Sequence, residues 1–300
     1  MVAFNEDAYE LQCLDWLQGI GWTWAKGPEI AHDGLMPERS SHKDVLLVER
    51  VEDALSRINP GTPKDAIRKF RQALESPGET DVLKANQQVH RWMTEGFPVT
   101  VREDSGEETT KLLWLFDFDN IENNDWLAVN QFSVAVNSDA GTRRPDIVLF
   151  LNGIPISVLE LKSPVDEDAD IWNAYDQLQT YKDQISRLFY YNSVLVIADG
   201  ADARMGSLTA DKERFLKWRS IDGEERDPHG AFGHTQTLIE GLFSKRHVLD
   251  IIQHFTIFAS GFKTIKMLPA YHQFYAVEKA YARSLTASSD DGDGRGGLMW

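Results

Sequence analysis

Apolar residues in the first quarter of the chain recur at helical spacing. Over residues 6–17 they fall on every third position and are followed by Gly19 and Gly21, so this stretch predicts an amphipathic helix that ends at glycine. Residues 44–58 and 63–74 repeat the pattern, and the second range begins with proline, which is favoured at a first helical position. We therefore expect the chain to open with three helices.

After residue 97, short β-branched and aromatic runs replace the helical pattern. The runs 99–101, 111–118 and 127–136 are separated by Asp, Asn, Gly and Ser residues and predict strands. The clearest hairpin joins 146–151 to 154–162, because the Asn-Gly pair between them tolerates the positive φ of a tight turn. A strand-rich core is expected in this region.

The next segment predicts a crossover connection. A helical pattern over 166–188 precedes the continuous apolar run 194–198, which is typical of a strand buried on both faces. A strand, a helix and a second strand in this order favour an α/β fold with a mixed sheet flanked by helices.

The last third of the chain reads as a polar stretch followed by helices. The polar stretch covers 199–233, and helices are expected over 237–243, 245–255 and 270–284. The tail 288–297 is rich in Gly, Ser and Asp and contains a G-x-G-x-x-G string, but the string follows a helix instead of a strand. A flexible linker is therefore a better interpretation than a cofactor loop.

Composition narrows the functional classes. The chain has 300 residues, 42% of them apolar, so a well-buried core is expected. Its 47 acidic and 31 basic residues give a net charge of −16, which opposes nonspecific attraction to a polyanion. Composition alone thus argues against a DNA-binding protein, and any nucleic-acid site is expected to be local.

The compartment follows from cysteine usage and hydropathy. Cys13 is the single cysteine and cannot form an intramolecular disulfide, which favours a reducing compartment. No apolar run approaches the length of a membrane span, and the N-terminus is acidic where a signal peptide would be basic. We expect a cytoplasmic protein without a membrane partner.

Three charged residues of the predicted hairpin form the strongest candidate site. Asp146 opens its first strand, and Glu160 and Lys162 close the second. Residues two apart in a strand face the same way, so Glu160 and Lys162 are expected to project together. Two carboxylates beside an ammonium can hold a hard divalent cation and orient a water for attack on phosphate. The alternative is a set of solvated charges at a strand end.

Other polar residues could join this site. Gln177 and Tyr181 are four residues apart on the predicted 166–188 helix and therefore share a face. Glu10 lies at the edge of the apolar stripe of the first helix and could add a carboxylate, with Glu6 one turn earlier as its substitute and a solvated helix charge as the alternative. Zinc motifs such as H-E-x-x-H are absent, so a metal is expected to be bound by oxygen.

The hairpin needs an irregularity if its carboxylates are to meet. A two-residue turn at Asn152-Gly153 pairs residues whose numbers sum to 305, which sets Asp146 opposite Leu159 and on the face away from Glu160. We therefore predict a one-residue bulge or an equivalent bend between the two carboxylates, with Gly153 as its expected position.

Several strings of the sequence resemble the N-terminal nuclease region of the R subunit of type I restriction-modification enzymes. They are Arg-Pro-Asp-Ile-Val-Leu-Phe-Leu-Asn-Gly-Ile-Pro-Ile from Arg144, Val-Leu-Glu-Leu-Lys-Ser-Pro from Val158, Gln-Leu-Gln-Thr-Tyr from Gln177, Leu-Ala-Val-Asn-Gln-Phe from Leu127 and Val-Leu-Val-Ile-Ala-Asp-Gly from Val194. The resemblance implies a PD-(D/E)xK restriction-endonuclease-like mixed sheet flanked by helices, in which Asp146 and Glu160 bind Mg²⁺ and Lys162 lies beside the attacking water.

The resemblance also assigns the supporting residues. Gln177 and Tyr181 match the Q-x-x-x-Y element of the family, which supports the active site and DNA. Glu10 matches the acidic position of the first core helix, and Glu6 remains the other candidate.

The C-terminal part resembles the start of a motor domain. Gln273, in Tyr-His-Gln, resembles the glutamine that contacts adenine in the family, and residues 296–300 resemble the strand before the phosphate loop. That loop is absent from residues 1–300, so ATP is expected to act only in a full-length subunit. The resemblance implies a nuclease domain over 1–230, a helical linker and start of a RecA-like motor over 231–287, and a flexible loop with a truncated first motor strand over 288–300.

The expected activity is Mg²⁺-dependent endonucleolytic cleavage of double-stranded DNA, in a complex with the methyltransferase and specificity subunits of a type I restriction system. One alternative is a noncatalytic docking module that links motor and methyltransferase. Another is a stand-alone PD-(D/E)xK repair nuclease.

Overall fold

A six-stranded mixed sheet forms the centre of the computed structural model, which describes residues 5–102, 107–138, 141–163, 170–224, 230, 232–289, 292, 294 and 295. Its strands are β1 (Thr23–Lys26), β4 (Trp126–Asn130), β7 (Ile147–Leu151), β8 (Ile154–Leu161), β9 (Val194–Ala198) and β10 (Ala203–Gly206). Their order is β1-β4-β7-β8-β9-β10; β1 runs parallel to β4 and β8 parallel to β9, and the other neighbours are antiparallel. The predicted α/β class is confirmed at the level of a mixed sheet flanked by helices.

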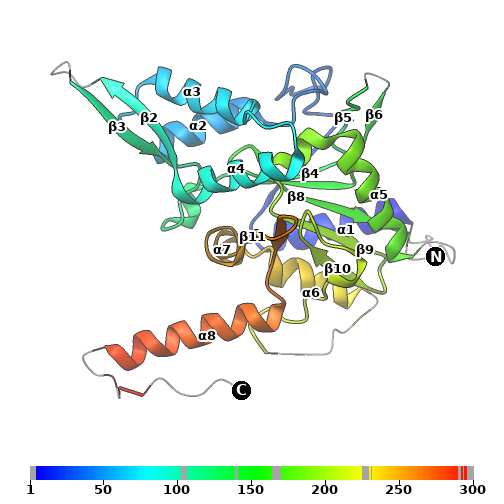
Figure 1. Ribbon diagram of the computed structural model, residues 1–300. Coiled ribbons are helices and arrows are strands. Elements are labelled where there is room, and N and C mark those ends of the chain that lie inside the picture. The colour runs from blue at the N-terminus through cyan, green and yellow to red at the C-terminus, as the bar shows by residue number, and fades with distance from the viewer. Residues whose placement is uncertain are drawn as a thin grey trace.

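Helices cover this sheet and extend beyond it. They are α1 (Glu6–Gly19), α2 (Val48–Ile58), α3 (Lys64–Glu75), α4 (Val82–Glu95), α5 (Ile171–Gln184), α6 (Gly233–Leu242), α7 (Lys245–Asp250) and α8 (Tyr271–Ser288). α5 packs against β8 and β9, and α1 packs against β1, β4, β8 and α6. Figure 1 shows α8 reaching away from the sheet at the bottom of the view. At the top of the view lie α2, α3 and the hairpin of β2 (Phe97–Arg102) and β3 (Glu108–Leu113).

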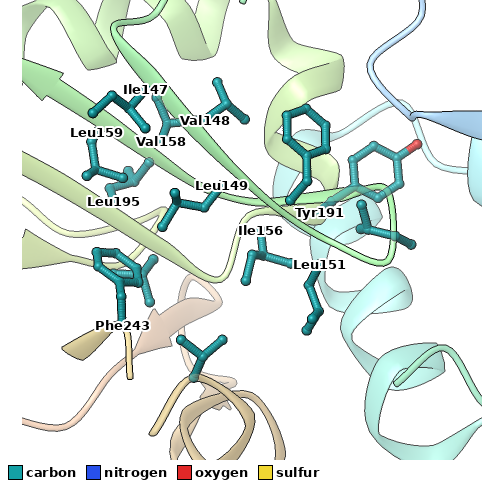
Figure 2. Close-up of a cluster of buried hydrophobic side chains, with 14 of the residues drawn as sticks. Ile147, Val148, Leu149, Leu151, Ile156, Val158, Leu159, Tyr191, Leu195 and Phe243 are labelled. Carbon is teal, nitrogen blue, oxygen red and sulfur yellow. The ribbon is translucent and has the colours of Figure 1, made fainter. Parts of the chain in front are cut away.

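The β7–β8 hairpin lies in the middle of the hydrophobic core. Every residue of both strands is buried, and Figure 2 shows their aliphatic side chains packed with Leu195 of β9 and Phe243. Apolar burial of this kind contributes roughly 25 cal/mol for each Å² removed from water. The hairpin is therefore held rigidly, and its ends are fixed platforms for side chains.

Several sequence-based predictions are confirmed. The first helix, the 63–74 helix and the 194–198 strand occur as α1, α3 and β9, and the crossover through α5 joins the parallel strands β8 and β9. The helices expected over 237–243 and 270–284 occur as α6 and α8. The helix expected over 245–255 divides into α7 and a π-helical turn, Ile251–Phe255.

Other boundaries were wrong because tertiary hydrogen bonds override local preference. The helix expected from residue 44 begins at Val48, since Leu47 N donates to Gly153 O at 3.0 Å in an extended segment. The 111–118 strand ends at Leu113, because the side chain of Asn59 binds both the N–H and the carbonyl of Trp114.

The 127–136 run and the 166–188 helix are also interrupted. The strand breaks at Gln131, whose φ is 56°, and resumes as the short β5 (Val134–Ala135), which pairs with β6 (Thr142–Arg143). The long helix reduces to α5 followed by a 3₁₀ segment, Ser186–Tyr191, and residues 166–169 lie outside the described part.

Several described elements were not predicted, and the short strands β1 and β6 are among them. α4 carries buried Asn86 and His90 on its inner face, which weakens the apolar pattern. β10 and the hairpin of β11 (Ile257–Ala259) and β12 (Ile265–Met267) are short and carry few consecutive apolar residues. The strand expected over 296–300 lies outside the described residues. Among the described helices, none combines the length and apolar composition that a bilayer span requires.

Candidate active site

A bulge in the β7–β8 ladder brings the two candidate carboxylates opposite each other. Leu149 pairs with Ser157, whereas Phe150 pairs with Pro155, so Ile156 is one extra residue on β8. Beyond the bulge Ile147 pairs with Leu159, and the same register sets Asp146 opposite Glu160. Paired residues share a sheet face. The predicted bulge is therefore confirmed.

The expected position of that bulge was wrong. Asn152 and Gly153 have φ values of 52° and 77°, which are the two positive angles of a tight two-residue hairpin turn, so the ladder stays regular at the turn. The extra residue follows Pro155, which has no N–H to donate and is tolerated inside sheets mainly at bulges. The proline in an otherwise apolar strand was the overlooked sequence signal.

Asp146 and Glu160 are buried at adjacent strand ends. Asp146 is 8% exposed, and its Oδ2 accepts a hydrogen bond of 2.7 Å from Leu161 N. Glu160 is fully buried, and its Oε1 lies 3.1 Å from Lys162 Nζ. The structure thus brings together the three residues that the sequence singled out.

A chain of hydrogen bonds connects the lysine to α5. Lys162 Nζ donates to Gln177 Oε1 at 2.7 Å, and Gln177 Nε2 donates to the Tyr181 hydroxyl at 2.6 Å. Tyr181 O–H in turn donates to Arg144 O at 3.5 Å, close to the start of β7. The spacing of four residues along α5 stacks Gln177 and Tyr181 on the face that meets the hairpin. These contacts fix where the ammonium of Lys162 sits.

Burial gives the carboxylates unusual electrostatics. Removal from water raises the pKa of Asp146 to about 7, against the opposing effects of the Leu161 N–H and Lys162. Burial, and next the charge of Asp146, raise the pKa of Glu160 well above its usual range. A buried carboxylate whose ionised form is destabilised by a second carboxylate is typical of functional sites.

Glu10 reaches the same neighbourhood from α1. It is 6% exposed, and its carboxylate accepts hydrogen bonds from Asn130 Nδ2 at 2.7 Å and Gln131 Nε2 at 2.5 Å. Burial raises its pKa, and the charge of Glu10 is one of the influences that raise the pKa of Asp146. Glu6, one turn earlier, is exposed.

Asn130 and Gln131 are site residues to which sequence reasoning gave no role. Their side chains hold Glu10, and both residues make further contacts. Gln131 N donates to Asp146 O at 2.9 Å, and Asn130 Oδ1 accepts from Trp24 Nε1 at 2.9 Å. The positive φ of Gln131 is rare for a residue with a side chain, and such strain clusters at functional sites. The sequence signal that could have indicated them is the polar pair Asn-Gln at the end of a buried strand, where the chain turns.

The donor set fits a hard divalent cation. Glu160 Oε2 is buried and has no hydrogen-bond partner among the residues that the structure describes. A free carboxylate oxygen opposite a second carboxylate offers the oxygen ligands that Mg²⁺ prefers, and a nearby cation would offset the cost of burying both charges. Asp146 and Glu160 are therefore the residues that could hold the ion.

Gln273 lies far along the chain, in the first turn of α8. Its Oε1 accepts a hydrogen bond from Ala270 N at 2.9 Å, and it lines a cavity of about 770 Å³ between the 205–216 segment and the 254–273 segment. Nothing in this geometry tests a contact with adenine.

The fold and the site together define an α/β protein with a buried carboxylate–lysine cluster on the central hairpin of its sheet. The sequence profile of the family described as Type I restriction enzyme R protein N terminus matches residues 3–214. The chain belongs to this family.

Named relatives agree with that membership. The endonuclease subunit of the HindI type I restriction enzyme of Haemophilus influenzae is 36% identical over 300 residues, covering 99% of this chain and 28% of that protein. A Methanocaldococcus jannaschii protein that carries the name of the MjaIXP type I restriction enzyme endonuclease subunit is 29% identical over 316 residues, covering 99% of this chain and 30% of that protein. The chain spans less than a third of the length of either relative.

Proposed function

We propose that this chain is the DNA-cleaving part of a type I restriction R subunit, with a PD-(D/E)xK site made of Asp146, Glu160 and Lys162. The observation that carries the proposal is the bulge at Ile156, which sets both carboxylates on one face beside the lysine. Without it the two carboxylates would project from opposite faces of the sheet, and no single cation could contact both.

Asp146 and Glu160 would hold Mg²⁺, Asp146 fixed by the Leu161 N–H and Glu160 through its free Oε2. When bound, Mg²⁺ supplies Lewis acidity that stabilises negative charge on a phosphate and makes water a better nucleophile. The burial of both side chains keeps bulk water from competing for the same oxygens.

Lys162 supplies a fixed positive charge next to the reacting phosphate. Its ammonium is held between Glu160 Oε1 and Gln177 Oε1, so one proton of its three remains to donate to an attacking water or a phosphate oxygen. Gln177 and Tyr181 act as positioning residues, because Gln177 binds the lysine and Tyr181 binds Gln177. A preorganised cation of this kind lowers the barrier by stabilising developing charge.

Glu10 would support the site from α1. Asn130 and Gln131 hold its carboxylate, and the same Gln131 backbone binds the carbonyl of Asp146. Glu10 is therefore placed to assist the binding of the cation, whereas exposed Glu6 is not held in this way.

The remaining functions of a restriction enzyme would reside in longer R subunits and other proteins. We assign ATP hydrolysis to a motor in the full-length subunit, with residues 231–287 as the helical start of a RecA-like domain and Gln273 as its adenine contact. The net charge of −16 agrees with double-stranded DNA being delivered by that motor and by the methyltransferase and specificity subunits. These subunits would act in the cytoplasm, where the DNA is.

The test is DNA cleavage by the assembled type I enzyme carrying Lys162→Ala in its R subunit. Loss of a positioned charge should lower cleavage by a factor on the order of 10² or more, while ATP-driven translocation continues. Lys162→Arg should restore part of the activity, and Lys212→Ala, which removes an exposed lysine, serves as the matched control.

The same experiment separates the rival functions. If this chain were a noncatalytic docking module, the assembled enzyme carrying Lys162→Ala would cleave DNA normally. Cleavage would then be lost only in variants that prevent subunit association. A stand-alone repair nuclease would cleave DNA with no requirement for the methyltransferase and specificity subunits, so cleavage by the R subunit alone at the same rate would contradict the proposal.

A further inference from the structure

We propose a second metal site, made of His32, Asp33 and His42, that binds a transition-metal ion such as Zn²⁺ and staples the long loop between β1 and α2. One ligand atom from each of these side chains lies within 4.8 Å of the other two, and His32 Nδ1 is 3.7 Å from Asp33 Oδ1. This site is separate from the Asp146–Glu160 pair and does not depend on the proposed nuclease function.

The loop has little regular structure to hold it. Residues 27–47 connect β1 to α2 with no helix or strand of their own, and loops of more than about 12–15 residues without secondary structure are commonly functional or ligand-organised. Its two ends are fixed, because Gly27 N donates to Asn130 O at 2.7 Å and Leu47 N donates to Gly153 O. Within the loop, Met36 N donates to Glu29 O and Glu38 N to Ile30 O, and a bound ion would add a cross-link between residues 32–33 and residue 42.

The two histidines approach each other across this loop. His42 is anchored, since its carbonyl accepts a hydrogen bond from Ala135 N at 2.8 Å. The His32 ring meets it edge to face, with 4.7 Å between ring centroids. His32 and Asp33 are exposed, so their side chains can rotate to the ligand spacing of about 3.3 Å that a tetrahedral ion with bonds of about 2.0 Å requires.

The donor types select the class of metal. Two imidazoles and one carboxylate suit Zn²⁺, Co²⁺ or Ni²⁺ and are poor ligands for Mg²⁺, which prefers oxygen. Three protein ligands leave the remaining positions to water. Asp33 supplies one negative charge to the ion. Asp33 also attracts the buried guanidinium of Arg39, whose positive charge would oppose the binding of a metal cation.

Calorimetric titration of the whole chain with Zn²⁺, in buffer containing excess Mg²⁺, tests the site. We expect one equivalent to bind, and His32→Ala and His42→Ala each to weaken binding on the order of tenfold or more. His272→Ala removes an exposed histidine outside the cluster and should leave the affinity unchanged. Binding should also survive Glu160→Gln, which distinguishes this ion from one in the candidate active site.

A second readout reports on ligands directly. Co²⁺ bound at this site should give a visible absorption band that His32→Ala and His42→Ala abolish, and limited proteolysis within residues 27–47 should slow when Zn²⁺ is present. Failure of Zn²⁺ to bind the folded chain, or binding that the double variant His32→Ala/His42→Ala leaves intact, would overturn the proposal. Circular dichroism of the metal-free variants should match that of the parent chain, since His32 is exposed and His42 is only half-buried.

Discussion

Individual buried charges identify the site more sharply than composition does. Glu160 has an unpartnered carboxylate oxygen within the described structure, and the charge of Asp146 raises the cost of ionising Glu160. Burial of a charge costs several kcal/mol, and Lys162 and the Leu161 N–H offset only part of the cost of burying this pair. The proposed cation would offset the rest of this cost.

A second buried charge lies outside the site and has a structural role. Lys266 of β12 is 2% exposed, and its Nζ donates to Asn86 Oδ1 at 3.0 Å and to Asn192 O. Both acceptors are neutral, so they offset only part of the desolvation cost. Burial lowers the pKa of Lys266 to about 7.

That shift predicts a pH-dependent stability. The unfolded lysine has a pKa near 10.4, so between about pH 7 and pH 10 the unfolded chain binds a proton at Lys266 that the folded chain lacks. The free energy of unfolding should therefore rise with pH in this window, by at most about 1.4 kcal/mol per pH unit, relative to Lys266→Met. Below pH 7 both states bind the proton and the difference should be constant.

Urea unfolding of the two proteins at several pH values measures this effect. Lys212→Met, at an exposed position, should run parallel to the parent chain. The quantity compared is the unfolding free energy of the parent chain minus that of Lys266→Met. If it stays constant or falls as pH rises from 7 to 10, the amine of Lys266 is charged in the folded protein.

At the scale of elements, the sequence predicted the hairpin, the crossover and the need for a bulge. Apolar runs and turn chemistry were sufficient to predict β7, β8 and β9. The position of the bulge depended on one imino acid, Pro155, that periodicity does not register. The helix α4 was missed because Asn86 is buried for its hydrogen bonds to carbonyls of the 189–192 segment, which no local pattern reveals.

The candidate site was predictable to a similar extent. The residue types and their spacing identified Asp146, Glu160 and Lys162, and helical spacing identified Gln177 and Tyr181. The contacts of Glu10 with Asn130 and Gln131 join α1 to the end of β4 across more than a hundred residues of sequence, and long-range pairing of this kind requires the fold.

The hairpin turn offers a test of how closely the elements pack. A Cβ added at Gly153 would lie 2.6 Å from Leu47 O, whereas at Gly61, which has nearly the same φ, it would meet nothing within 4 Å. Gly61→Ala should cost about 1–2 kcal/mol of unfolding free energy from the positive φ alone. Gly153→Ala should cost more unfolding free energy, because Leu47 and the start of α2, which pack against the turn, must also shift.

The comparison of the two variants by urea denaturation isolates the steric part. Equal losses of stability in Gly153→Ala and Gly61→Ala would mean that the segment at Leu47 moves freely and that the hairpin end is not rigidly held.

At the scale of the whole molecule, the C-terminal helices are built into the sheet domain. The Tyr9 hydroxyl lies 2.6 Å from Thr235 Oγ1, and Trp22 Nε1 donates to Phe243 O at 2.9 Å. Ser207 and Thr209 also donate to the carbonyl of Lys266. The segment after residue 230 therefore covers surfaces of α1, Trp22 and β10 that are otherwise apolar or need hydrogen-bond partners.

These contacts predict that a chain ending at residue 230 is much less stable than the 300-residue chain. Removal of α6 to α8 would expose Tyr9 and Trp22, take Thr235 away from the Tyr9 hydroxyl and deprive Trp22 Nε1 of the Phe243 carbonyl. Thermal unfolding followed by circular dichroism should show a lowered midpoint or aggregation. An unchanged midpoint would establish 1–230 as an independent unit.

We propose that Asp146 and Glu160 share one divalent cation. Anomalous diffraction from crystals of the chain grown with Mn²⁺ and a short DNA duplex would locate that ion directly. We expect a manganese peak within about 2.0–2.6 Å of an oxygen from each carboxylate, and its loss in Glu160→Gln. Ordered carboxylates with no peak between them, or a peak that Glu160→Gln leaves in place, would contradict it.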